Sequence, residues 1–394
     1  MKKILRVLLI FCLLFTLIAC KDNNQNTDGL QKGEIILPVA MNVDSTDGAV
    51  KIPFETTGDE GTINWSIDNT SVATVDEDGF ITTHGNGQAI ITATNSSFTS
   101  TMHLVATKDK YINYTRIKSK LEFLFIFSNP SNFNSPDQFY LLDTDIDFNG
   151  DSISPIGGWD LSNDETPIDS SRQFRATLDG RGYALKNFKI INPSTTKVDQ
   201  SYFGVSLIPF IYDGKVVNLN IIDAIFSGSG FTGSIAGKIE KGTIENCFVK
   251  ATITATLANP GIPAGGIAGI IGADALIKNV ILDVKVNGGF IYSGFNFGTG
   301  LNSNAISKTL ADTIRRPIQN TAVTTNKGDE NEDAALKDFV NSRRIEDDEL
   351  GDMDKYTLTQ DAKANVWAIA NGYMPFIIRR DGLTPSWAKI ATNP

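Results

Sequence analysis

Short apolar segments recur between Leu178 and Val286, and glycines separate them. An asparagine stands near the start of each segment, with spacings of 31, 28 and 33 residues: Asn187, Asn218, Asn246 and Asn279. A repeat of about 30 residues is typical of a solenoid, because one unit can bury its apolar face only by stacking on the next. The pattern therefore predicts a region of stacked repeats.

The composition of these repeats favours strands over helices. They are rich in Ile, Val, Phe and Thr, and Gly interrupts them, as in the run 265–269. β-Branched residues favour pleated strands, and each internal Gly would cost a helix about 1 kcal/mol. We therefore expect a parallel β-helix with its asparagines in an inward ladder. The alternative is that the asparagines are ordinary turn residues that merely recur.

Residues 34–107 follow a different pattern, in which apolar and polar positions alternate over short runs such as 63–67 and 89–94. Acidic and Gly-rich turns separate the runs, for example at 76–79. This spacing predicts a small β-sandwich.

A junction lies between the two regions. Apolar residues at helical spacing stand between Tyr114 and Phe127: Ile117, Leu121, Leu124 and Phe125. We expect a short helix here that caps the open end of the solenoid, because an uncovered coil would expose the edge of its strands.

The first twenty residues resemble a bacterial lipoprotein signal. Lys2, Lys3 and Arg6 precede an apolar run that ends in Leu17-Ile18-Ala19-Cys20. The resemblance implies that the leader is removed and that Cys20 carries the lipid. An uncleaved membrane helix is the alternative, although the run is short for a span of about 20 residues. The polar stretch that follows predicts a flexible tether.

Charge and cysteine content narrow the classes of partner. The chain has 35 basic and 45 acidic residues and a formal charge of −10, which disfavours a nucleic-acid partner. Of three cysteines, Cys12 would leave with the leader, Cys20 would be acylated and Cys247 would remain alone, so we expect no intramolecular disulfide. A chain of this length predicts two or more domains.

The sandwich region resembles a known family. Trp65-Ser66, Asn69 and the runs 72–75, 79–81 and 89–93 are similar to the bacterial Ig-like domain, group 2. The resemblance implies a spacer or adhesive module of cell-surface proteins.

The repeat region carries a second resemblance, from Phe139 to about residue 290. Residues 140–148, 174–187 and 265–269 resemble the right-handed β-helix proteins that carry the GLUG motif. The chain departs from that pattern at 203–207 and by an insertion at 159–172. The resemblance resumes at 366–376, which we expect to form the last coil and cover the bottom of the core.

These observations predict an all-β chain: an Ig-like β-sandwich followed by a short right-handed parallel β-helix with a capping helix. The expected parts are a lipoprotein signal peptide with acylated Cys20 (1–20), a tether (21–33), the Ig-like sandwich (34–107), and the capping helix, β-helix and closing segment (108–394).

A cluster of acidic and amide side chains suggests a calcium site: Asp143, Asp145, Asp147, Asn149 and Asp151. Its spacing mimics the first half of a calcium loop, but Ile156 occupies the position at which an EF-hand needs a carboxylate. The alternative is a structural role in a strand and turn, and no other cofactor is indicated.

Catalytic chemistry has little support. The two histidines, His84 and His103, both lie in the sandwich, so a Ser-His-Asp set within the solenoid is excluded. Some β-helices cleave polysaccharides with clustered acids and bases, and the candidates here are Asp143, Asp147, Asp179 and Arg181. Residues 179–182 are more simply interpreted as a turn. We therefore expect a protein that is not an enzyme.

Trp159, in the inserted segment, is the best candidate for stacking on a sugar, and its alternative role is a loop anchor. Together these features predict a lipid-anchored protein on the extracellular face of the cell membrane. We expect it to bind a glycan or a host or matrix protein. The alternatives are a polysaccharide-degrading β-helix enzyme and a structural envelope protein.

Overall fold

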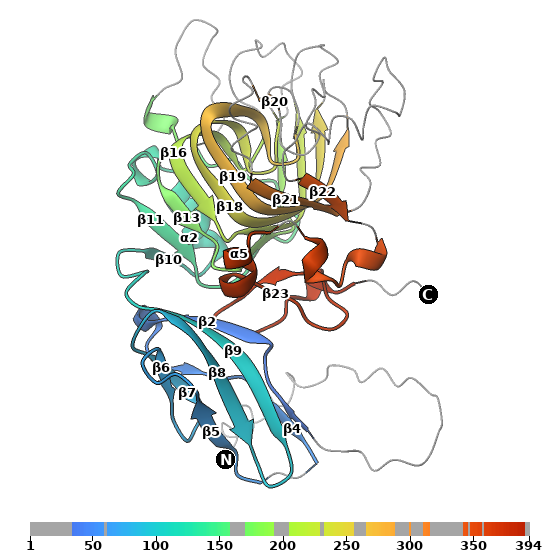
Figure 1. Cartoon of the computed structure of the whole chain (residues 1–394). Helices are drawn as coiled ribbons and strands as arrows, with labels where there is room; N and C mark the ends of the chain where they lie inside the picture. The colour runs from blue at the N-terminus through green and yellow to red at the C-terminus, as the bar shows by residue number, and fades with distance from the viewer. Residues whose placement is uncertain are drawn as a thin grey trace, which may run out of the picture.

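The computed structural model describes residues 34–58, 61–157, 170–192, 205–228, 232–255, 265–287, 299–300, 310–315, 342–345, 347–356 and 358–390. A small β-sandwich lies at one end, a larger stack of parallel strands at the other, and the C-terminal segment between them (Figure 1). No helix in these ranges is both long enough and apolar enough to span a membrane.

The N-terminal sandwich has two principal sheets. One contains, in spatial order, β2 (Ala40–Asp44), β9 (Thr99–Thr107), β8 (Gly87–Thr94) and β5 (Asn64–Ile67). The other contains β3 (Val50–Lys51), β7 (Phe80–Thr83) and β6 (Ala73–Val75), and β1 (Glu34–Ile36) pairs with β4 (Glu55–Thr57). The alternating pattern explains the packing, since inward residues from both sheets share one core that includes Met41, Ile81, Ile91 and Leu104.

The larger sheet has 13 strands, and every pairing within it is parallel. Its first strands are β10 (Thr115–Ile117), β11 (Phe139–Leu142), β12 (Ile146–Asp147), β13 (Thr177–Asp179), β14 (Ala184–Lys186) and β15 (Lys189–Ile191). The long strands are β16 (Ile208–Val217), β17 (Asn220–Gly228), β18 (Ala236–Ala255) and β19 (Ala268–Asn287). The last are β20 (Thr299–Gly300), β21 (Leu310–Arg315) and β22 (Ser342–Ile345), so pairing extends beyond the region of sequence resemblance.

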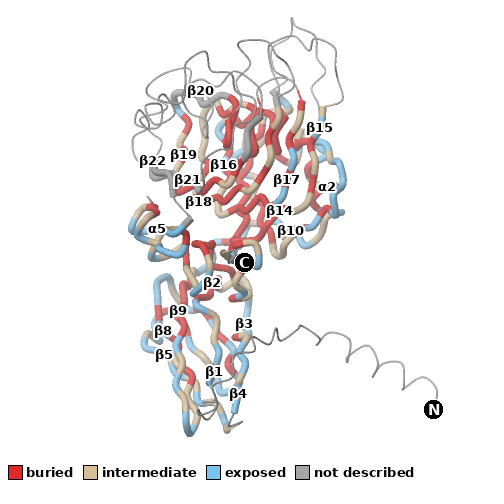
Figure 2. The backbone as a smooth tube through the Cα atoms, turned by 90° about the vertical axis from the view of Figure 1, so that its right-hand side faces the viewer, coloured by how far each residue is buried: buried red, intermediate tan, exposed pale blue. Residues whose placement is uncertain are grey.

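Register places each repeat directly over the previous one, which yields columns of inward side chains. Leu178 pairs with Val216, Val216 with Ile244, and Ile244 with Ile277, and all four are buried. Figure 2 shows that burial is concentrated in the stacked strands. The predicted stacking of repeats around a common apolar interior is therefore present in the described residues.

Three of the four asparagines align as the expected ladder requires, but only one pair of them is hydrogen-bonded, because the Asn279 side chain pairs with Thr359 instead. Asn218, Asn246 and Asn279 align at one corner, all with positive φ, and the Asn246 amide donates to Asn218 Oδ1 at 3.2 Å. The placement of Asn187 in that ladder was wrong. Asn187 aligns with Asp223 at a different corner, since the preceding residues Lys186 and Ile222 are paired. Both corners need a left-handed residue, which asparagine and aspartate tolerate, so spacing alone merged two columns.

The predicted helix at 114–127 is shorter than expected. Residues 115–117 form strand β10, and α2 spans Lys120–Phe127 with Ser119 as its N-cap. The expected buried face was also wrong, because Leu121 and Phe125 are 78% and 79% exposed. Phe123 and Phe127 are buried instead, and Phe123 packs edge-on against Phe148 of the first repeat. The helix therefore covers the start of the stack through a different face.

The C-terminal segment does not form a last coil, contrary to the sequence prediction. β23 (Trp367–Ala368) and β24 (Phe376–Ile377) form an antiparallel hairpin, preceded by α5 (Gln360–Asn365). Trp367 and Ile377 pack with outward-facing residues of the stack, including Phe248 and Ile281. Phe248 and Ile281 form an apolar column on the outside of the stack, which would be exposed to water without the hairpin. The hairpin therefore lies on the flank of the stack instead of at its end.

Candidate functional site

A densely connected polar region lies where the sandwich meets the parallel stack. On the sandwich side, a single 3₁₀ turn (Ser45–Asp47) follows strand β2. Asp44 accepts from the Thr46 amide and Asp47 accepts from the Asp44 amide, which together form a capping box. This turn fixes the Asp47 backbone and leaves its carboxylate directed at the stack.

Three arginines from separate parts of the chain surround the Asp47 carboxylate. Arg181, in the turn after β13, donates to both carboxylate oxygens, with the Nη1–Oδ1 distance at 2.8 Å. Arg116 of β10 donates to Oδ1 at 3.0 Å, and Arg380 lies 3.8 Å from the same oxygen. Asp143 also pairs with all three arginines, at 3.0 to 3.7 Å. We call these five residues the arginine–aspartate cluster.

The centre of the cluster is dry. The side chains of Asp47 and Arg181 are 0% and 1% exposed. Burial alone would raise the pKa of Asp47, but the hydrogen bonds and charge of Arg181 and the charge of Arg116 outweigh it and lower that pKa. The carboxylate is therefore ionised, and the bidentate geometry gives the pair both strength and a fixed orientation.

The segment that leaves the sandwich adds a second set of contacts. The Tyr111 hydroxyl donates to Asp179 at 3.2 Å, and Lys110 lies 3.4 Å from the same carboxylate. The Arg181 guanidinium lies over the Tyr111 ring, 4.7 Å from its centroid. Burial and the nearby Asp179 charge raise the pKa of Tyr111 well above its ordinary value, so this hydroxyl stays a donor.

The C-terminal hairpin completes the junction by packing on the sandwich as well as on the stack. Ala40 and Val105 share a buried cluster with Phe376 and Ile378. The backbone N–H of Asn42 donates to the backbone carbonyl of Arg379 at 3.1 Å. Sandwich, stack and hairpin therefore meet in one continuous interface that combines apolar packing with buried ion pairs.

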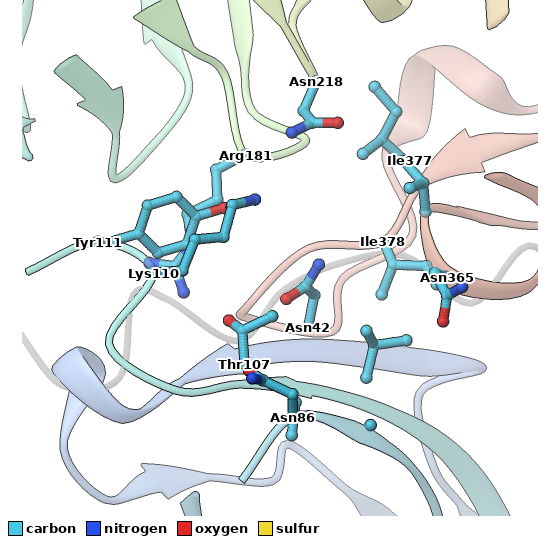
Figure 3. A pocket seen from close by; sticks show the side chains of 14 residues that line it. Asn42, Asn86, Thr107, Lys110, Tyr111, Arg181, Asn218, Asn365, Ile377 and Ile378 are labelled. Carbon is cyan, nitrogen blue, oxygen red and sulfur yellow. The ribbon is translucent and has the colours of Figure 1, made fainter. Parts of the chain in front are cut away.

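A cavity of about 290 Å³ lies within this interface (Figure 3). Its walls come from the sandwich, the connecting segment, the stack and the hairpin. The polar lining includes Asn42, Asn86, Lys110, Arg181 and Asn218. Val105 and Ile378 are among the apolar residues that line it.

The four aspartates among the five residues predicted to bind calcium are each engaged by other groups of the protein. Asp143 belongs to the arginine–aspartate cluster, and Asp145 pairs with Lys186 and Arg379. Asp147 accepts from the Asn187 amide and from the backbone of Asn149, and Asp151 pairs with Lys120. Within the described residues, no three His, Cys, Asp or Glu side chains gather in a way that could hold a metal ion. The calcium site thus stays a prediction.

The other predicted site residues divide between the junction and the undescribed parts of the chain. Asp179 and Arg181 stand in a turn, as their spacing indicated, and Arg181 has a φ of 54°. Their side chains are engaged in the junction. Trp159 and Cys20 lie outside the described residues.

Sequence reasoning missed the junction because its members are scattered across the chain. Asp47 and Arg380 drew no attention, because each stands in a short turn-like run of polar residues with no motif of its own. The Asp44–Asp47 spacing of a capping box was the one local signal that could have located the turn. Nothing local indicated which arginines would reach it.

Comparison with known families bears on the sandwich. A family model described as the intimin immunoglobulin-like domain matches residues 48–97. The N-terminal sandwich is an immunoglobulin-like domain. The match agrees with the predicted Ig-like class, although the matching model is intimin-type and not group 2. Searches of curated proteins and of solved structures found no match. The junction therefore joins an Ig-like domain to a parallel β-stack.

Proposed function

We propose that the chain is a lipid-anchored surface protein in which the Ig-like domain and a short right-handed parallel β-helix form one rigid unit for binding or adhesion. The observation that carries this proposal is the buried Asp47–Arg181 pair. Interfaces between domains of one chain commonly permit relative motion. A buried, bidentate ion pair, supported by further ion pairs and by the apolar contacts of the hairpin, would instead hold the stack at a set orientation to the domain that precedes it.

The match to an intimin-type Ig-like domain supports a surface adhesion-type module. The succession of repeats supports the β-helix, because every pairing between neighbouring repeats is parallel. A stack of this kind offers a long lateral surface to a glycan or protein partner.

Binding is favoured over catalysis by the positions of the strongest catalytic candidates. Asp143, Asp179 and Arg181 are held in buried structural pairs, so their charges already have partners. A nucleophile or general acid needs a side chain that can reach a substrate.

Two experiments test the proposal. Metabolic labelling with radioactive palmitate should label the wild type and spare Cys20→Ser, and equal labelling of both would exclude the anchor. The purified chain should bind at least one component of a glycan array or a panel of matrix proteins without releasing reducing or unsaturated sugars. Sugar release without retention would instead support the polysaccharide-degrading alternative.

A further inference from the structure

Two of the residues that line the junction cavity each have a buried polar atom with no hydrogen-bond partner among the described residues. These atoms are Asn42 Oδ1 and Arg181 Nε. Arg181 is 2% exposed. Buried polar atoms are almost always paired, so two orphans at one cavity call for a missing partner. Leaving each unpaired costs about 1–3 kcal/mol.

The two orphans need opposite hydrogen-bonding roles. An amide oxygen only accepts and a guanidinium N–H only donates. A carboxylate or phosphate would satisfy Arg181 but present a second acceptor to Asn42. An ammonium group would satisfy Asn42 and repel Arg181. A hydroxyl group both donates and accepts, so it is the simple group that serves both atoms.

Charge around the cavity also favours a neutral ligand. Arg181 is paired with Asp47 and Lys110 with Asp179, so each of the two cations that line the cavity already has a carboxylate partner. A charged ligand would lose its hydration without gaining an unpaired counter-charge.

Size and lining narrow the ligand further. About 290 Å³ corresponds to the liquid volume of about ten water molecules, which suits a molecule of about a dozen non-hydrogen atoms. Amide side chains line the cavity at several points around it, among them Asn42, Asn218 and Asn365 (Figure 3). Val105, Ile377 and Ile378 offer apolar surface between them. A pyranose has this character, because its ring carbons present an apolar patch and its hydroxyls point outward.

We propose that the cavity between the Ig-like domain and the β-stack binds one neutral pyranose unit, either a free sugar or the terminal residue of a glycan. Its hydroxyl would donate to Asn42 Oδ1 and accept from Arg181 Nε. This inference rests on the proposed binding function and assigns that function a site. It also places the ligand against both domains, so that binding and the rigidity of the junction reinforce each other.

The test uses ligand-observed saturation-transfer NMR on the full chain in detergent. The probes are glucose, galactose, mannose, N-acetylglucosamine, inorganic phosphate and acetate, and oligosaccharides that end in each sugar distinguish free from terminal units. Asn42→Leu removes the acceptor and narrows the cavity. Asn64→Leu makes the same change on the exposed side of β5 and serves as the control. Asn86→Leu, at the outer wall, serves if Asn42→Leu does not fold.

We expect one of the neutral sugars to bind, at least tenfold more weakly in Asn42→Leu and unchanged in Asn64→Leu. Binding that Asn42→Leu and Asn86→Leu leave unchanged would overturn the site while leaving the binding function in place. Phosphate or acetate binding alone would overturn the neutral ligand. Absence of sugar binding in a chain that still binds array or matrix components would show that the cavity holds only water, which also overturns the inference.

Discussion

Arg181 donates from both terminal nitrogens to the two carboxylate oxygens of Asp47, a residue 134 positions earlier in the chain. One partner belongs to the turn between strands β13 and β14, and the other to the 3₁₀ turn after β2. The pair is buried on both sides. A contact of this kind cannot adjust gradually, because a small relative rotation of the two domains would separate two desolvated charges.

Removing one member of this pair should be costly. Arg181→Met leaves the buried Asp47 with one hydrogen-bonded arginine, Arg116, and with Arg380 at 3.8 Å. We expect a loss of about 1.5–3 kcal/mol in the free energy of unfolding, because the bidentate pair is removed. The double variant Asp47→Leu/Arg181→Met should recover part of that loss, because the buried carboxylate that lost its bidentate partner is also removed, while Arg116 and Arg380 keep Asp143. Urea unfolding of the wild type, both single variants and the double variant measures the coupling. Strictly additive effects would show that the two side chains do not interact.

Acid should weaken the junction. Asp47 has a pKa below the ordinary value of 3.8, and so has Asp44, where burial is outweighed by hydrogen bonds from Thr46, Thr107 and Lys110. A lowered folded-state pKa contributes stability that is fully present above the unfolded-state value and is lost as pH falls through the folded-state value. We therefore expect the free energy of unfolding to decline below about pH 4.

A titration of stability in Asp47→Asn is the matched control, since it removes this carboxylate with little change in shape. Its decline on acidification should be shallower than that of the wild type. Identical acid profiles would mean that the pKa of Asp47 is the same in the folded and unfolded states, which would contradict the buried pair.

The stability of the corner formed by Asn218, Asn246 and Asn279 should depend on how well the residue at 246 tolerates a left-handed backbone. Asn246 has a φ of 52° and its amide donates to Asn218. Asn246→Ala loses the hydrogen bond and keeps a side chain in the left-handed region, where an ordinary residue pays about 1–2 kcal/mol. Asn246→Gly loses only the hydrogen bond, so thermal unfolding should rank wild type, Gly and Ala in that order. A Gly variant no better than Ala would contradict the strained corner.

Two phenylalanines on α2, one buried and one exposed, give a matched pair of variants. Phe123 is 2% exposed and Phe125 is 79% exposed on the same helix. Phe123→Ala should cost about 3–5 kcal/mol, because it opens a cavity beside Phe148. Phe125→Ala should change stability by less than about 0.5 kcal/mol. Chemical denaturation of both variants checks which face of the helix covers the stack, and the reverse ranking would mean that the sequence prediction was right.

Cys247 should be unreactive in the folded protein. It is fully buried in β18, and burial raises the pKa of its thiol to about 12. Thiolate is the reactive form, so alkylation should require unfolding. Iodoacetamide treatment at pH 8 followed by peptide mass analysis measures the modified fraction with and without urea. Rapid modification in buffer alone would place this strand at the surface.

The sequence could predict the structural features that depend on the periodic spacing of apolar residues. The recurrence of apolar segments indicated parallel stacking, and the inward column through Val216 and Ile244 follows from that register. The alternation in residues 34–107 likewise indicated a sandwich. Both depend on neighbouring residues, whose side chains alternate between faces of a strand.

The predictions that the structure does not support concern features set by contacts between residues distant in the sequence, or by patterns that fit more than one structure. The run from Phe123 to Phe127 is apolar at every position, so helical spacing could not identify the buried face. The 366–376 segment resembled a closing coil, but the apolar column containing Phe248 decided its position. Asp143 looked like a calcium ligand because its three arginine partners come from distant parts of the chain.

The rigidity of the junction is tested most directly by a distance distribution between the two domains. Spin labels at Ser97→Cys in the Ig-like domain and Asp137→Cys beside the stack, with Cys12 and Cys20 replaced by serine, suit double electron–electron resonance. We expect one narrow distribution, which broadens when Arg181→Met is introduced. A broad distribution in the chain with its junction intact would contradict the account of a single rigid unit.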